Sequence, residues 1–115
     1  MRNFRNWEVW KNAKSLVKIV YQVTASFPDT EKFGLTNQIR RAAVSIPANI
    51  AEGAGRRTEK DFKNFLYIAL GSAFELEALI DLSHDLSFIK KDRFDELHDR
   101  INHIQRQLNS FIQKL

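Results

Sequence analysis

Residues 33–57 read FGLTNQIRRAAVSIPANIAEGAGRR, and this stretch indicates the fold of the chain. Apolar and small side chains recur in it at three- and four-residue steps, which is the spacing of one face of an α-helix. They are Ile39, Ala42, Ala43, Ile46, Ile50 and Gly53. Because most of them are small, a neighbouring helix can approach this face closely. The stretch therefore predicts a tightly packed helix that begins near Thr36, with Thr36 as its N-cap.

Pro47 lies in the middle of this predicted helix. A proline in a helix interior removes the hydrogen bond to the carbonyl four residues earlier, here that of Ala43, and costs about 3 kcal/mol. The chain can continue as one kinked helix, or divide into two short helices with Ser45 as the cap of the second. We expect one kinked helix, because the apolar face keeps its phase from Ile39 to Gly53.

A second stripe with the same spacing lies beside the apolar face and is entirely polar. Its members are Gln38, Arg41, Ser45, Asn49, Glu52 and Arg56. The stripe is either a solvated surface with an ion pair between Glu52 and Arg56, or part of a polar network between helices or subunits. The short side chains of Ser45 and Asn49 favour a close interface. We therefore take both as candidate subunit-contact residues.

The next helix is expected from Glu59 to about Ser87, with Thr58 as its N-cap and Gly53 and Gly55 loosening the end of the helix before it. Residues 65–74 carry no charge, and their apolar side chains point in every direction around the axis. A helix that is apolar all round must be covered all round, and three neighbours in one small bundle cover only part of it. We predict that a stripe including Leu70 and Phe74 contacts another subunit.

Two outer helices complete the prediction. The first runs from its cap Asn6 to about Ser26 and buries a face of Trp10, Ala13, Val17, Val20 and Thr24, widened by Leu16 and Val23. The last starts near Asp92 and carries a heptad seam of Phe94, Leu97, Ile101, Ile104, Leu108, Phe111 and Leu115. This seam fits a coiled-coil partner site or, as we favour, the chain's own bundle. Residues 1–115 are thus expected to form one all-α domain, an up-and-down four-helix bundle.

Positive charge is concentrated in the first part of the chain. Residues 1–66 hold twelve Lys and Arg against six Asp and Glu, whereas residues 67–115 hold six against eight. Basic side chains follow one another through the predicted turn between the second and third helices, with two more earlier on the second helix. These residues are Arg40, Arg41, Arg56, Arg57, Lys60 and Lys63. We predict that they contact RNA phosphates, although a basic solvated face gives the same pattern. Few aromatic residues accompany them in the sequence, so we expect base stacking to be minor.

Signals for enzyme chemistry are weak. The chain has no Cys, and its glycines lack the spacing of a phosphate-binding loop. The pairs Asp81-x-x-His84 and Asp95-x-x-His98 could share a helical face, but a two-metal carboxylate site needs further acids from the other helices. We predict no catalytic residue, no metal, no cofactor and no small-molecule substrate. The charged start and the short uncharged runs predict a cytoplasmic protein with no membrane segment.

Two runs of the sequence closely resemble one known family. They are FPDTEKFGLTNQIRRAAVSIPANIAEGAGR at residues 27–56 and DFKNFLYIALGSAFELE at residues 61–77. The chain resembles the four-helix-bundle family of bacterial 23S rRNA intervening-sequence proteins from Trp10 to about Ile89, and the NIAEG and IALGS segments are specific to it.

The resemblance implies a small all-α protomer that assembles into a homopentamer and has no catalytic residues. A distant relative of this fold, the accessory protein of diversity-generating retroelements, is a basic pentamer that binds nucleic acid and a reverse transcriptase. We therefore expect a non-enzymatic homopentamer that binds RNA or an RNA-bound partner. The main alternative is a purely structural assembly with a polar central channel, and a metal-dependent enzyme ranks third.

Overall fold

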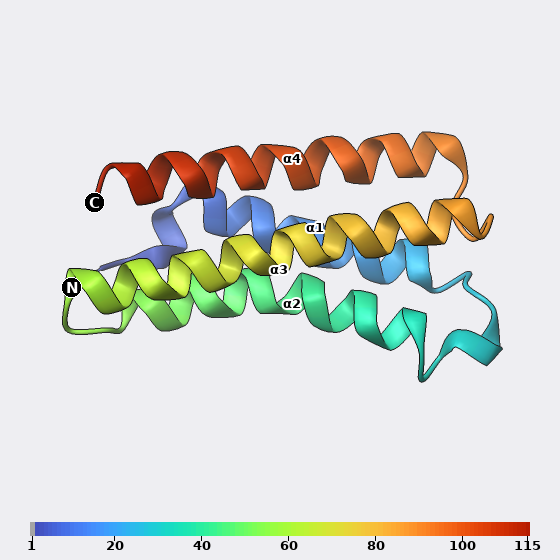
Figure 1. Cartoon of the computed structure of the whole chain (residues 1–115), viewed down its shortest axis with the longest axis horizontal. Helices are drawn as coiled ribbons and strands as arrows, with labels where there is room; N and C mark the ends of the chain where they lie inside the picture. The colour runs from blue at the N-terminus through green and yellow to red at the C-terminus, as the bar shows by residue number, and fades with distance from the viewer. Residues whose placement is uncertain (1) are drawn as a thin grey trace.

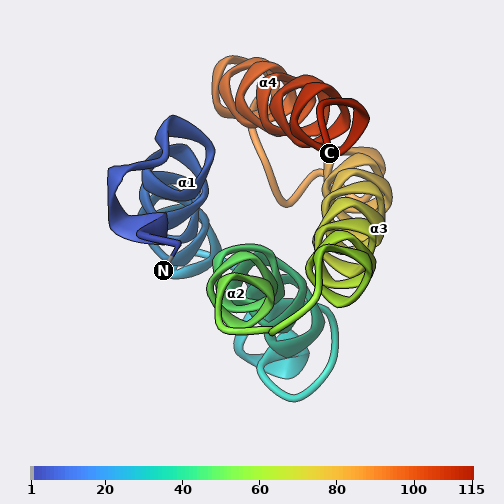
Figure 2. The same cartoon turned by 90° about the vertical axis from the view of Figure 1, so that its left-hand side faces the viewer.

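Four α-helices run alternately up and down the long axis of the molecule (Figure 1). The computed structural model describes residues 2–115, and no strand occurs among them. The helices are α1 (Glu8–Thr24), α2 (Leu35–Ala54), α3 (Glu59–Asp85) and α4 (Lys91–Gln113), with short 3-10 turns η1 (Phe4–Asn6) and η2 (Asp29–Glu31). Seen along the axis, the four helices surround a common core (Figure 2). The predicted all-α, up-and-down four-helix bundle is confirmed.

Each helix contributes one apolar face to this core. All six members of the predicted α2 face are buried. On α4 the heptad residues Leu97, Ile101, Ile104 and Leu108 are buried as well. The seam of α4 therefore packs into its own bundle, as we favoured. On α1 the buried face is centred on Leu16 and Val20, while Trp10 and Val17 are only partly buried at its edges.

The closest approach in the bundle is between α2 and α3. A Cβ atom added to Gly53 would lie 2.8 Å from Cβ of Phe65 and 3.1 Å from Cδ1 of Phe62. Gly53 is thus a position of close packing inside α2. The expectation that it loosens the end of the helix is wrong. α2 also continues through Pro47 without interruption, which confirms one helix there rather than two.

Two of the predicted N-caps are wrong. Asn6 ends η1, and Trp7, in extended backbone, takes the cap position of α1. At the start of α2 the cap position belongs to Gly34, and Oε1 of Glu31 accepts a hydrogen bond from the backbone N–H of Leu35 at 3.3 Å. Thr36 cannot cap because it lies inside the helix on the face that turns toward the core.

The cap of α3 follows the prediction, whereas the end of α3 comes earlier. Oγ1 of Thr58 accepts a hydrogen bond from the backbone N–H of Asp61 at 3.1 Å. The helix ends at Asp85 because Ser87 takes the left-handed conformation, with φ of 64°. The backbone N–H of Phe88 then donates to the carbonyl of Ser83 at 2.9 Å, which closes a Schellman motif.

Candidate nucleic-acid and subunit interfaces

The predicted basic cluster lies at one end of the bundle, on the turn between α2 and α3. The start of α1 and the end of α4 lie at the same end (Figure 1). Arg57 and Lys60 are exposed, and Lys63 is partly buried. The structure therefore brings positive charge from the α2–α3 turn next to both terminal segments of the fold.

Arg56 is held in place by two contacts within the protomer. Its Nη2 atom lies 3.4 Å from Oε1 of Glu52, and its guanidinium lies 4.4 Å from the centre of the Phe65 ring. The Arg56 side chain nevertheless remains 44% exposed, and an ion pair this exposed contributes little to stability. Arg56 is oriented by these contacts and still presents its charge to solvent.

Arg40 and Arg41 do not join the other four basic residues. Nε of Arg40 donates to Oγ1 of Thr24 at 2.9 Å, and its guanidinium lies 4.4 Å from the centre of the Tyr21 ring. Arg40 thus binds the last turn of α1, where a cation is favourable for the helix dipole. Arg41 is exposed but lies about 22 Å along α2 from Arg56 at 1.5 Å per residue. The predicted six-residue site is therefore divided in the structure.

Arg2 is a basic residue of this end that the sequence analysis missed. Its Nη1 atom donates to the carbonyls of Ala54 and Arg56, and its guanidinium lies 4.5 Å from the centre of the Phe62 ring. These contacts place a cation at the C-terminal end of α2, where unpaired helix carbonyls accept hydrogen bonds. No local sequence signal could reveal them, because Arg2 is more than fifty residues from Ala54.

Aromatic side chains gather at the same end, although few lie near the basic cluster in the sequence. The ring centres of Trp7 and Phe111 are 4.9 Å apart, and Phe62 lies 5.6 Å from Trp7 and 5.7 Å from Phe111. Phe65 adds a fourth ring beneath Arg56. Phe65 thus contacts the basic cluster directly, and the expectation that base stacking is minor stays a prediction.

Ser45 and Asn49 take part in a polar network between α2 and α3. The hydroxyl groups of Ser45 and Ser72 are 2.8 Å apart, and Nδ2 of Asn49 donates to the carbonyl of Ser45 at 2.8 Å and to its Oγ at 2.9 Å. Both side chains are partly buried. The polar stripe therefore links two helices of one protomer at its centre and is exposed at Gln38, Arg41 and Glu52.

Several apolar side chains of α3 are open to solvent. Tyr67, Ile68, Phe74 and Leu82 are each at least 50% exposed on this helix. A Cβ atom added to Gly71, which lies among them, would meet no atom within 4 Å. Leu70, in contrast, is partly buried and packs against the core of its own bundle. The exposed stripe therefore includes Phe74 but is not centred on Leu70.

The histidines of the two Asp-x-x-His pairs both lie against Phe94 and form no metal-binding group with their acids. The rings of His84 and His98 lie 4.3 Å and 5.8 Å from the ring of Phe94, which contacts both. Oδ2 of Asp95 instead pairs with Nζ of Lys91 at 2.9 Å. Among residues 2–115 no group of three or more His, Asp and Glu side chains is placed to hold a metal ion. Within the same residues no helix is long and apolar enough to span a bilayer.

Comparisons with known proteins agree with the observed fold. The chain matches the crystal structure, at 1.70 Å resolution, of a protein of unknown function of the S23 ribosomal protein family from Bacteroides thetaiotaomicron VPI-5482. The TM-score is 0.82 and the sequence identity 28%, over 90% of this chain and 97% of that one. No curated protein matches the chain. The sequence model of the 23S rRNA-intervening sequence protein family matches residues 5–110. The chain belongs to the family of 23S rRNA-intervening sequence proteins.

Proposed function

We propose that the protein is a non-enzymatic homopentamer of the cytoplasm that binds RNA through the basic end of its bundle. The observation that carries this proposal is the cluster of Arg56, Arg57, Lys60 and Lys63 on the α2–α3 turn, beside the termini of the fold. Arg57 and Lys60 are exposed, and Arg56 keeps 44% of its side chain accessible while two contacts orient it. Such a cluster can contact several phosphates of one strand.

Assembly would multiply this modest charge. The apolar stripe of Tyr67, Ile68, Phe74 and Leu82 supports a contact between copies of the chain, because exposed apolar side chains gathered on one helix favour association. Ser45 and Asn49 would lie beside that contact on the α2–α3 seam. In a symmetric ring each protomer presents the same basic end, so that weak phosphate contacts act together on one RNA.

A structural assembly without RNA binding is the second candidate. The same apolar stripe supports it, because a contact between copies needs no nucleic acid. The two functions differ in what the basic cluster does: phosphate contacts release counterions and make affinity fall steeply with salt, whereas a solvated basic face does not bind.

An RNA gel shift over a series of salt concentrations tests the proposal. The test variant replaces Arg56, Arg57, Lys60 and Lys63 by Ala. The matched control carries the same loss of charge at the exposed residues Lys18, Lys32, Lys90 and Lys91, away from the cluster. We expect the test variant to bind structured RNA more weakly, with the salt slope reduced by about one unit for each phosphate contact removed.

The control variant should keep the affinity and the salt slope of the unmodified protein. Circular dichroism and light scattering would show that both variants remain folded and assembled. If the test variant and the control lose the same affinity, or if the unmodified protein binds no RNA, the assignment of the basic end as an RNA interface is wrong.

A further inference from the structure

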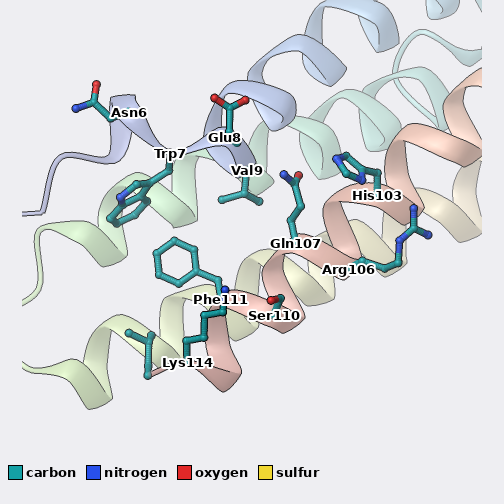
Figure 3. A pocket seen from close by; sticks show the side chains of 11 residues that line it. Asn6, Trp7, Glu8, Val9, His103, Arg106, Gln107, Ser110, Phe111 and Lys114 are labelled. Carbon is teal, nitrogen blue, oxygen red and sulfur yellow. The ribbon is translucent and has the colours of Figure 1, made fainter.

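A cleft of about 660 Å³ opens between the start of α1 and the last turns of α4. Figure 3 shows Trp7 and Val9 on one side, and Gln107 and Phe111 of α4 on the other. Its size falls within the range of about 300–1,000 Å³ that is typical of small-molecule sites. None of the residues that line the cleft belongs to the basic turn, although the start of α1 and the end of α4 lie at the same end of the bundle as that turn (Figure 1).

The inner wall of the cleft is apolar and aromatic. The rings of Trp7 and Phe111 meet edge to face, with an interplanar angle of 70°, and Phe62 supports both from beneath. Trp7, Phe111 and Leu115 are only partly buried, so each keeps some surface open. Trp7 and Phe111 line the cleft and are held by each other and by the buried Phe62, so either ring can hold a flat group at little entropic cost.

The amide of Gln107 offers a hydrogen-bond donor to the cleft. Oε1 of Gln107 accepts a hydrogen bond from Nδ2 of Asn12 at 3.0 Å, which fixes the orientation of the amide. Nε2 of Gln107 donates to no residue in the described part of the chain. An alkyl chain in the cleft would leave this donor without an acceptor, whereas a heteroaromatic ring offers nitrogen and oxygen acceptors at its edge.

The rim of the cleft carries more positive than negative charge. Arg106 and Lys114 stand on the α4 side, and within residues 2–115 neither takes part in an ion pair. Glu8 is the acid on the rim, and it lies 3.5 Å from Nζ of Lys11. An anionic group attached to the bound ring would therefore find a cation on the α4 side.

We propose that this cleft binds a nucleotide, with the base against Trp7 and Phe111 and the phosphate at Arg106 or Lys114. The face of one of the two lining rings can stack on the base, the amide of Gln107 meets its polar edge, and the unpaired cations fit the phosphate. The nucleotide is either free in solution or an unpaired one in an RNA strand. In the second case the inference rests on the function proposed above, since the strand would continue from the basic turn into the cleft.

Trp7 fluorescence reports on the cleft directly. The chain has two tryptophans, so a Trp10→Phe variant leaves Trp7 as the single reporter. Adenosine monophosphate should quench it saturably, because a base stacked on the indole changes its emission. Ribose 5-phosphate, which has the phosphate but no base, should leave the emission unchanged. Equal responses to both compounds, or a response to dodecanoate and not to the nucleotide, would overturn the assignment.

A blocking variant separates the two sources of the nucleotide. Ser110 is exposed and lines the cleft, whereas its neighbour Asn109 is exposed outside the lining. Ser110→Phe should fill the cleft and abolish quenching by adenosine monophosphate, while Asn109→Phe should not. If an RNA base enters the cleft, Ser110→Phe should also weaken binding of single-stranded RNA by roughly fivefold or more, the loss expected for one stacked base. Binding of duplex RNA should not change.

The outcomes distinguish this inference from the proposed function. Quenching by the nucleotide with unchanged RNA binding in Ser110→Phe assigns the cleft to a free nucleotide. RNA binding that depends on the basic turn, without any response of Trp7 to nucleotide or RNA, refutes the cleft site and leaves the proposed function intact. Quenching by nucleotide in a protein that binds no RNA refutes the proposed function alone.

Discussion

At the scale of single residues, the two buried threonines differ in the hydrogen bonds of their hydroxyl groups. Oγ1 of Thr24 donates to the carbonyl of Val20 at 2.7 Å and accepts from Nε of Arg40 at 2.9 Å. Oγ1 of Thr36 is buried and has no hydrogen-bond partner among the described residues. Removing a hydroxyl from water without a hydrogen-bond partner lowers the stability of the fold. When the hydroxyl has a partner, the hydrogen bond offsets the cost of its desolvation.

Replacing each threonine by valine should therefore change stability in opposite directions. Thr36→Val keeps the shape and removes the unpartnered hydroxyl, so we expect the free energy of unfolding to rise by about 1 kcal/mol. Thr24→Val removes the acceptor of the Arg40 guanidinium and should lower it by about 1–3 kcal/mol. Urea unfolding followed by circular dichroism measures both changes. Destabilisation by Thr36→Val equal to that of Thr24→Val would show that the Thr36 hydroxyl is bonded in solution.

At the scale of elements, the contact between α2 and α3 depends on the absence of a side chain at Gly53. The backbone carbonyl of Phe62 would lie 3.2 Å from an added Cβ, in addition to the atoms of Phe65 and Phe62 already described. Because backbone and ring atoms cannot move aside independently, a methyl group there must push the helices apart. The sequence predicted a close approach on this face from its small residues, and the structure shows where it is closest.

Gly53→Ala should lower the free energy of unfolding by about 1–3 kcal/mol, the usual cost of overpacking. Gly55→Ala is the matched control, because its added Cβ would meet only the carbonyl of Glu52 at 3.5 Å and its φ of −85° suits any residue. The control should be neutral or stabilising by up to about 1 kcal/mol, since alanine reduces the entropy of the unfolded chain. Thermal unfolding compares the two variants. Equal effects would mean that helix propensity, and not packing, decides the result.

At the scale of the whole molecule, one apolar face remains without a partner in the protomer. The prediction that helices of one bundle cannot cover α3 on all sides agrees with the exposure of its outer face, where Phe74 is 56% exposed. The sequence could indicate this from composition alone, because residues 65–74 carry no charge. It could not place Leu70, which packs against the core of its own bundle.

Phe74→Glu should separate the proposed pentamer into protomers. An assembled protein would have about five times the protomer mass of 13.4 kDa in light scattering coupled to size exclusion. A carboxylate at a buried subunit contact costs several kcal/mol, whereas at a half-exposed position of a lone protomer it costs little. Leu86→Glu is the control, because Leu86 is equally exposed at 56% but lies beyond the end of α3. A monomeric unmodified protein, or an unchanged mass for Phe74→Glu, would contradict the proposed interface.

The sequence by itself determined the class of fold, the number of helices and most of the core. These depend on periodicity and local backbone preference, as the buried α2 face and the Thr58 cap show. It could not determine which helix ends pack together, and it misassigned the caps Asn6 and Thr36. Trp7 takes the cap position of α1 beside the rings of Phe62 and Phe111, which are distant in the chain.

In the candidate sites, too, some features could be predicted from the sequence and others depend on tertiary packing. The basic turn was visible in the sequence because its residues lie close together in the chain, but Arg2, the aromatic wall and the cleft between α1 and α4 were not. The sequence grouped Arg40 with the turn, whereas the structure assigns its guanidinium to Thr24 and Tyr21 of α1. A side chain's charge is a property of the residue, but its partners are set by contacts between distant segments. Only tertiary packing decides those contacts, because it alone brings such segments within hydrogen-bonding distance.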